Sequence, residues 1–137
     1  MRTCTRRLEF DAAHRVMEHE SKCRNLHGHR YVAEVTCGAK GLDKLGRVID
    51  FGAVKAVLGT WIDERWDHGM IVHRNDHEII QLCKQAGWRV YEMRANPTAE
   101  NLAEELFRLG TEMLWPLGIA IERVRVYETP NCWADYP

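Results

Sequence analysis

The sequence predicts an α+β fold in which an antiparallel sheet carries helices on one face. Segments with strand-like alternation stand near both ends of the chain, and segments with 3.6-residue helical periodicity lie between them. Strands and helices that are grouped in this way, rather than strictly alternating, favour an antiparallel sheet. The chain has 137 residues, of which 45% are hydrophobic and 28% charged. We therefore expect one domain over residues 1–137, large enough to bury a core.

Two strands are predicted at the N-terminal end, with a long polar loop between them. Residues 2–10 alternate loosely, and residues 29–37 alternate more clearly. Residues 11–26 are polar and irregular, and loops of that length are often functional. Glycines mark residues 38–46 as a turn or an open loop. One face of the second strand should carry Tyr31, Ala33, Val35 and Cys37.

Two helices are predicted in the middle of the chain. Asp50 is a suitable N-cap, and apolar residues at helical spacing follow it over residues 51–65. A shorter helix is expected over residues 76–86, with Gly87 just past its end. Residues 88–93 form a short extended stretch.

A long helix and a last strand are predicted near the C-terminus. Asn96 is a capping residue, and Pro97 suits the first helical position. The helix should end at residues 115–116, a Trp-Pro pair. Residues 119–128 alternate as a strand, and residues 129–137 have no regular pattern.

The stretch from Cys23 to His29 has the residue types of a metal site. Side chains at i and i+2 of a strand point to one face, so His27 and His29 should project together, with the uncrowded Gly28 between them. Two imidazoles held in this way suit a borderline-soft metal such as zinc. His14, just after the first strand, is the natural third ligand, and three protein ligands leave an open catalytic position. Cys23 is either a fourth ligand or a reactive thiol.

The histidines of this stretch, and three polar residues further along the chain, also have plainer interpretations. Two nearby histidines in a chain with seven can be surface residues. Asp67 and His68 can be a helix end with a histidine that suits the helix dipole. Glu128 can be an exposed carboxylate at the end of a strand. Local spacing alone does not choose between these interpretations.

The order of the motifs resembles the family of 6-pyruvoyltetrahydropterin and 6-carboxytetrahydropterin synthases. That family carries Phe-x-Ala-Ala-His and then Cys-x-x-x-His-Gly-His, which stand here at residues 10–14 and 23–29. Further matching segments follow in the family's order at residues 48–51, 67–68, 97–103 and 128–129. The resemblance implies the tunnelling fold, in which subunit sheets join around a threefold axis into a barrel. It also implies a homo-oligomer, a hexamer made of two trimers, with active sites at subunit boundaries.

The resemblance also implies roles for individual side chains. A carboxylate beside an imidazole fixes its tautomer, so an Asp-His pair can take a proton from a thiol. One carboxylate can accept two hydrogen bonds from the amino edge of a pterin. The implied catalytic residues are Cys23, Asp67, His68 and Glu128. The implied zinc ligands are His14, His27 and His29, and the substrate-binding residues are Glu128, Thr98 and Glu100. Thr98 and Glu100 can equally be the hydroxyl and carboxylate of a first helical turn.

The implied substrate is 7,8-dihydroneopterin triphosphate, and the family makes two products from it. The 6-pyruvoyl enzymes eliminate triphosphate, whereas the 6-carboxy enzymes also release acetaldehyde, on the path to 7-deazapurines such as queuosine. Three residues separate Cys23 from His27, as in the bacterial 6-carboxy group. We therefore expect a zinc-dependent carbon–carbon lyase that makes 6-carboxytetrahydropterin. A 6-pyruvoyl enzyme and a non-catalytic zinc- or pterin-binding protein remain the alternatives.

Composition excludes several other classes of protein. The net charge of −1 argues against sequence-independent electrostatic binding of nucleic acid. No run of about 18 apolar residues is present, so we expect no membrane span. The first seven residues lead into no apolar signal segment, and the five scattered cysteines form no disulfide framework. We expect a cytoplasmic protein.

Overall fold

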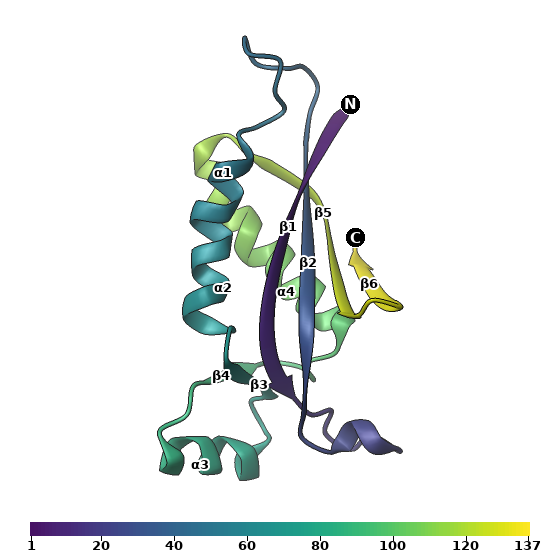
Figure 1. The fold of residues 1–137 in the computed structure, drawn as a ribbon, viewed down its shortest axis with the longest axis vertical. Coiled ribbons are helices and arrows are strands. Elements are labelled where there is room, and N and C mark those ends of the chain that lie inside the picture. Colours follow the sequence, from purple (N-terminus) through teal and green to yellow (C-terminus); the bar gives the residue numbers. More distant parts are fainter.

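A computed structural model describes all residues from 1 to 137 and is built on one six-stranded sheet. The strand order is β4-β3-β1-β2-β5-β6, and helices α1, α2 and α4 cover one face of the sheet (Figure 1). We call this the inner face and the opposite one the outer face. In chain order the elements are β1 (Arg2–His14), η1 (Lys22–Arg24), β2 (His27–Ala39), α1 (Phe51–Val54), η2 (Lys55–Gly59), α2 (Thr60–Arg65), β3 (Gly69–His73), α3 (His77–Ala86), β4 (Val90–Met93), α4 (Ala99–Leu114), η3 (Trp115–Leu117), β5 (Ala120–Thr129) and β6 (Cys132–Tyr136).

The α+β class and the one-sided helices are confirmed. The strands β1, β2, β5 and β6 pair antiparallel, as expected. The two short strands β3 and β4 were not predicted as a pair, and they join β1 in parallel, so the complete sheet is mixed. None of the helices combines the length and apolar character that a membrane crossing needs.

The first two strands are longer than the sequence predicts. We expected β1 to end at Phe10, but it runs to His14, which lies inside the strand and not after it. We expected β2 to begin at His29, but it begins at His27. The reason is pairing: residues 11–14 lack clear alternation, yet each has a partner in β2, ending with His14 opposite His27.

Two further predictions near the C-terminus need correction. The expected irregular tail contains β6, which pairs with β5. The cap of α4 is Thr98 and not Asn96, because the Thr98 side chain accepts a hydrogen bond from the Asn101 N–H at 3.2 Å. Asn96 instead bonds the backbone of Met17, with its amide oxygen 3.0 Å from the N–H and its amide nitrogen 3.2 Å from the carbonyl.

The helices meet the predictions more closely. The helix predicted over residues 51–65 is present as the continuous run α1, η2 and α2, with Asp50 as its N-cap. The helix expected over 76–86 is α3, and Gly87 follows it with a φ of 73°, the left-handed conformation that glycine adopts readily.

The core lies between the inner face and the helices and holds a cluster of 22 buried residues. Phe10 of β1 stacks on Tyr31 of β2, with ring centroids 5.1 Å apart, and Trp66 packs against Phe10 at 5.5 Å. Along β1 the inward-facing row is Leu8, Phe10, Ala12 and His14, all buried. The polar end of that row is where the candidate centre begins.

Candidate metal centre

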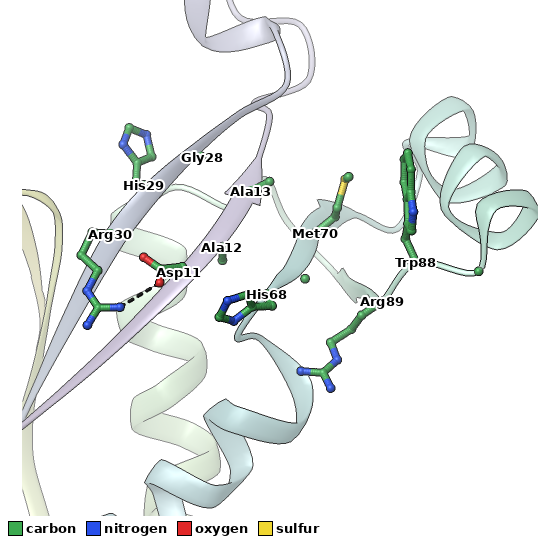
Figure 2. Close-up of a pocket in the computed structure, with 12 residues that line it drawn as sticks. Asp11, Ala12, Ala13, Gly28, His29, Arg30, His68, Met70, Trp88 and Arg89 are labelled. Carbon is green, nitrogen blue, oxygen red and sulfur yellow. Dashed lines mark hydrogen bonds and ion pairs between the residues drawn. The ribbon is translucent and has the colours of Figure 1, made fainter.

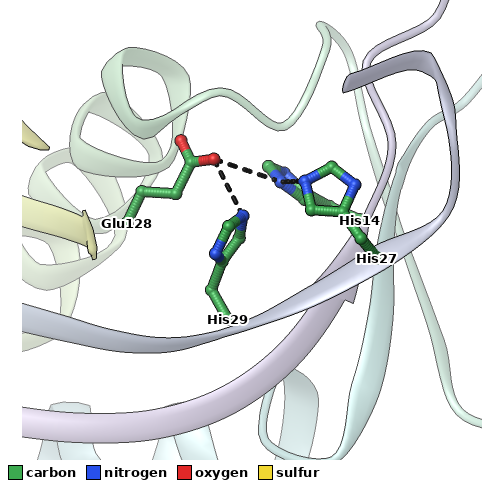
Figure 3. A group of neighbouring side chains, drawn as sticks. All are labelled: His14, His27, His29 and Glu128. Carbon is green, nitrogen blue, oxygen red and sulfur yellow. Dashed lines mark hydrogen bonds and ion pairs between the residues drawn. The ribbon is translucent and has the colours of Figure 1, made fainter. Parts of the chain in front are cut away.

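Three histidines and one glutamate meet at the end of the inner face. His14 ends β1 opposite His27, the first residue of β2, and His29 follows two positions along on the same face. Glu128 reaches the group from β5 (Figure 3). The four potential ligand atoms all lie within 4.8 Å of one another. The structure therefore brings together the three predicted ligands and adds a carboxylate that spacing alone did not place there.

The Nδ1 atoms of His14 and His27 are held by backbone carbonyls. His14 Nδ1 lies 2.7 Å from the Pro97 carbonyl oxygen, and His27 Nδ1 lies 2.7 Å from the Asn25 carbonyl oxygen. A carbonyl only accepts, so each Nδ1 carries the proton and donates it. Each Nε2 then directs a free lone pair at the centre, as in metal-binding histidines whose other ring nitrogen donates to a carbonyl.

Burial favours the neutral, metal-binding form of two of the imidazoles, those of His14 and His29. Burial lowers the pKa of both His14 and His29, and the negative charge of Glu128 only partly opposes this effect. His29 Nε2 lies 2.9 Å from Glu128 Oε1 but has no partner with hydrogen-bond geometry, although the atom is buried. Imidazole nitrogens, a carboxylate and a buried nitrogen without a hydrogen-bond partner are a donor set that fits a divalent metal such as zinc.

The loop between β1 and β2 is fixed by contacts on both sides. Arg15, directly after His14, makes a two-pronged ion pair with the buried Asp76, with contacts of 2.6 and 2.5 Å. The Val16 N–H donates to the Cys23 carbonyl at 2.9 Å, and Asn96 holds Met17. This framework holds the segment that carries Cys23. The half-buried Cys23 itself stands in η1 and is not part of the ligand group.

Asp67 and His68 form a coupled pair at the edge of the sheet. His68 Nδ1 lies 2.7 Å from Asp67 Oδ2, and the other carboxylate oxygen accepts the Asp11 N–H at 2.9 Å. Burial works to raise the pKa of Asp67, but hydrogen bonds from Asp11 and His68 outweigh it, and the pKa is lowered. His68 has a φ of 56°, an uncommon conformation outside glycine, and its N–H donates to the Asp11 carbonyl at 2.7 Å.

This pair lies across the sheet from the histidines. His68 borders a shallow cavity of about 660 Å³ on the outer face, together with Arg30, Trp88 and Arg89 (Figure 2). Asp11 and Arg30 are neighbours in register and point outward, whereas His29 points inward. Within one chain, the structure does not bring His68 to the ligand group.

The remaining predicted residues stand at the start of α4. Thr98 caps α4 and directly follows Pro97, whose carbonyl holds His14. Glu100 is exposed in the first turn of the same helix. Asn25, Asn96 and Pro97 support the centre although the sequence did not predict this role, since two of them act through backbone carbonyls that carry no residue signature.

Comparison with known proteins decides the family. A family model described as 6-pyruvoyl tetrahydropterin synthase matches residues 3–137. The chain belongs to this family. A Rickettsia conorii protein named 6-carboxy-5,6,7,8-tetrahydropterin synthase is 46% identical over 134 residues, covering 96% of this chain and 97% of that protein. An Aquifex aeolicus protein of the same name is 31% identical, covering 94% and 93%.

Solved structures share the fold. An uncharacterized protein from Wolinella succinogenes aligns with a TM-score of 0.84 at 23% identity, over 98% of this chain and 97% of that one. The 6-pyruvoyl tetrahydropterin synthase of Caenorhabditis elegans aligns with a TM-score of 0.71 at 24% identity, over 98% and 93%. The sheet and helices described above are therefore those of the tunnelling fold, and the chain is a member of a family of pterin lyases.

Proposed function

We propose that this protein is a zinc-dependent lyase that converts 7,8-dihydroneopterin triphosphate to 6-carboxy-5,6,7,8-tetrahydropterin, with release of acetaldehyde and triphosphate. The observation that carries the proposal is the 46% identity, over nearly the full length of both chains, to a protein named for this product. The cluster of three histidines and one glutamate supports it, because it supplies a metal-binding donor set at the end of the inner face.

His14, His27 and His29 would hold the metal through their Nε2 atoms. The carbonyls of Pro97 and Asn25 orient two of the rings, so little reorganisation is needed when a ligand binds. When bound, zinc supplies a Lewis acid that polarises the side-chain hydroxyls of the substrate.

Cys23 would act as the acid–base group at the substrate side chain. Its position outside the ligand group supports this role over that of a fourth ligand. Asp67 holds His68 in one tautomer, with Nδ1–H donated to the carboxylate, so His68 Nε2 is free to exchange protons with a thiol.

Glu128 would receive the amino edge of the pterin. A carboxylate has two oxygens and about four acceptor positions, so it can contact the pterin while remaining beside the histidines. Thr98 and Glu100 stand at the adjacent start of α4, and we assign them to the same substrate-binding wall.

A second copy of the chain would complete the site. His68 borders a cavity on the outer face, whereas the side chains of the ligand group point to the inner face, and this arrangement supports a site shared between chains. We therefore propose a homo-oligomer, a hexamer of two trimers, in which the Asp67–His68 pair of one subunit serves the centre of its neighbour.

The product distinguishes this proposal from the 6-pyruvoyl alternative. Loss of triphosphate with internal proton shifts leaves a three-carbon diketone side chain. Adding one water across the bond between its two carbonyl carbons yields the 6-carboxyl group and acetaldehyde, with no redox change. The 6-carboxy product is a precursor suited to 7-deazapurines such as queuosine. The three-residue gap between Cys23 and His27 of this chain supports the 6-carboxy branch.

One assay tests the proposal. Zinc-loaded protein is incubated with 7,8-dihydroneopterin triphosphate, and the products are identified by mass spectrometry. We expect 6-carboxytetrahydropterin and acetaldehyde in equal amounts. A 6-pyruvoyl product would move the protein to the other branch, and bound but unchanged substrate would make it a pterin-binding protein.

A further inference from the structure

Tyr31 is fully buried beside the candidate metal centre, and its hydroxyl has no hydrogen-bond partner. Its ring lies edge-on to those of His14 and His29, with centroids 5.8 and 5.5 Å away. A buried hydroxyl without a partner destabilises a fold, and most such groups in native proteins are satisfied. An unsatisfied hydroxyl at this place therefore needs an explanation.

The sheet register places Glu128 opposite Tyr31. Val32 pairs with Tyr127, and continuing the antiparallel register by one residue sets Tyr31 against Glu128. Both face inward, like the buried pair Ala33 and Val126 two residues further along. Directly opposed side chains of an antiparallel pair are close enough to interact. Burial raises the pKa of the Tyr31 hydroxyl, and the negative charge of Glu128 adds to this effect.

The glutamate has acceptor capacity to spare. Its two contacts with the histidines both use Oε1, which is 2.9 Å from His29 Nε2 and 3.6 Å from His14 Nε2. A metal would take those same nitrogens, so the carboxylate loses its present partners when the centre is filled. Tyr31 is a neutral phenol at neutral pH and therefore a donor.

We propose that Tyr31 is a positioning residue for Glu128: in the metal-loaded protein its hydroxyl donates a hydrogen bond to the Glu128 carboxylate and holds it ready for the pterin. This inference rests on the proposed function for the identity of the ligand. A phenol donating to a carboxylate makes a charge-assisted bond, which restricts the rotation of the glutamate and stabilises its charged form. Glu128 would then present a fixed acceptor to the amino edge of the substrate.

The test is a double-mutant cycle between Tyr31→Phe and Glu128→Gln. Phenylalanine keeps the ring that stacks on Phe10 and removes only the hydroxyl. Binding of neopterin, a fluorescent pterin, is measured on the zinc-loaded proteins. We expect Tyr31→Phe to weaken binding about tenfold, the scale of a hydrogen bond to a charged group. In the Glu128→Gln background the same change should have little further effect, because the acceptor charge is already gone.

Two variants serve as matched controls. Tyr127→Phe removes a hydroxyl from the residue next to Glu128, but that hydroxyl points to the outer face and bonds Glu34. Thr111→Val removes another buried hydroxyl without a partner, on α4. Both should bind neopterin like the wild type.

The melting temperatures of the four zinc-loaded proteins of the cycle give a readout that needs no pterin. A hydroxyl that is merely unsatisfied predicts that Tyr31→Phe raises the melting temperature equally in both backgrounds. The positioning role predicts non-additive shifts. Additive shifts, or wild-type neopterin affinity in Tyr31→Phe, would overturn the inference. Failure of the wild type to bind zinc or neopterin would refute the proposed function, and with it the metal-loaded state on which the role of Tyr31 rests. Zinc and neopterin binding by the wild type together with additive shifts would refute the role of Tyr31 alone.

Discussion

At the scale of single residues, the three histidines differ in how each is held. His14 and His27 each donate from Nδ1 to a backbone carbonyl, so their rings are oriented before any metal binds. The buried His29 Nε2 has no hydrogen bond and lies beside Glu128. The orientation of His29 therefore depends more than the others on the ion or on the carboxylate.

We expect replacement of His27 by alanine to remove most of the zinc. His27 belongs to the ligand group, with its Nε2 atom 3.2 Å from His14 Nε2. Two imidazoles and a carboxylate bind zinc far more weakly than three imidazoles do. Elemental analysis of purified protein measures the effect. The control is His73→Ala on β3, outside the ligand group, which should keep its metal. Full zinc occupancy in His27→Ala would disprove the ligand assignment.

Cys23→Ala should keep its zinc and lose turnover by about a hundredfold or more, the usual scale for removing an acid–base group. The structural reason is that Cys23 stands outside the group of ligand atoms. Iodoacetamide should inactivate the wild type, and bound pterin should protect it. The matched control is Cys132→Ala, an exposed thiol on β6, which should leave turnover unchanged. Loss of zinc from Cys23→Ala would make the cysteine a ligand and transfer the proton chemistry to His68.

At the scale of secondary-structure elements, the start of α4 serves both the fold and the centre. Thr98 caps the helix, and the preceding Pro97 holds His14 through its carbonyl. Thr98→Ala should lower the free energy of unfolding by about 1 kcal/mol, because one N–H of the first turn loses its partner. Urea unfolding at a fixed chain concentration measures this change. Thr98→Ser keeps the cap and should have a free energy of unfolding near that of the wild type.

The same two variants test whether Thr98 contacts the pterin. If it does, Thr98→Ala but not Thr98→Ser should weaken neopterin binding. Equal binding by the two variants would restrict Thr98 to capping.

The sequence predicts long elements well and short ones poorly, for physical reasons. The apolar stripes of α2, α3 and α4 and the alternation of β2 are local signals, and the structure has these elements. Residues 11–14 and 132–136 lack such a pattern and are strands only because a neighbouring strand supplies their hydrogen bonds. The short strands β3 and β4 likewise depend on tertiary pairing.

In the candidate centre, too, the features with a local sequence pattern were predictable and those that depend on tertiary contacts were not. The spacing of His27 and His29 in a strand was enough to predict that they lie together, and β2 places them so. The contact of Glu128 with His29 depends on the register between β2 and β5, which no local pattern specifies. Tyr31 could be recognised only as a core residue, because an unsatisfied hydroxyl is visible only when its surroundings are known.

At the scale of the whole molecule, the sheet separates the groups that the proposed chemistry needs together. The ligand group lies on the inner face, and the Asp67–His68 pair borders a cavity that opens on the outer face. A hexamer would give a mass near six chains by light scattering at micromolar concentration. A monomer with full turnover would contradict the shared site.

Subunit mixing tests the shared site more directly than mass does. Cys23→Ala and His68→Ala chains should each be inactive alone, because each lacks one member of the proton path. If one subunit supplies Cys23 and its neighbour supplies His68, random assembly of equal amounts restores both groups in about one quarter of the sites. Co-expression of the two chains with different tags, followed by two purification steps, isolates the mixed oligomers, and turnover per site is then measured. The control mixes Cys23→Ala with Cys23→Ala/His68→Ala chains, which share one defect and should stay inactive. Mixed oligomers as inactive as this control would mean that both groups act from the same chain.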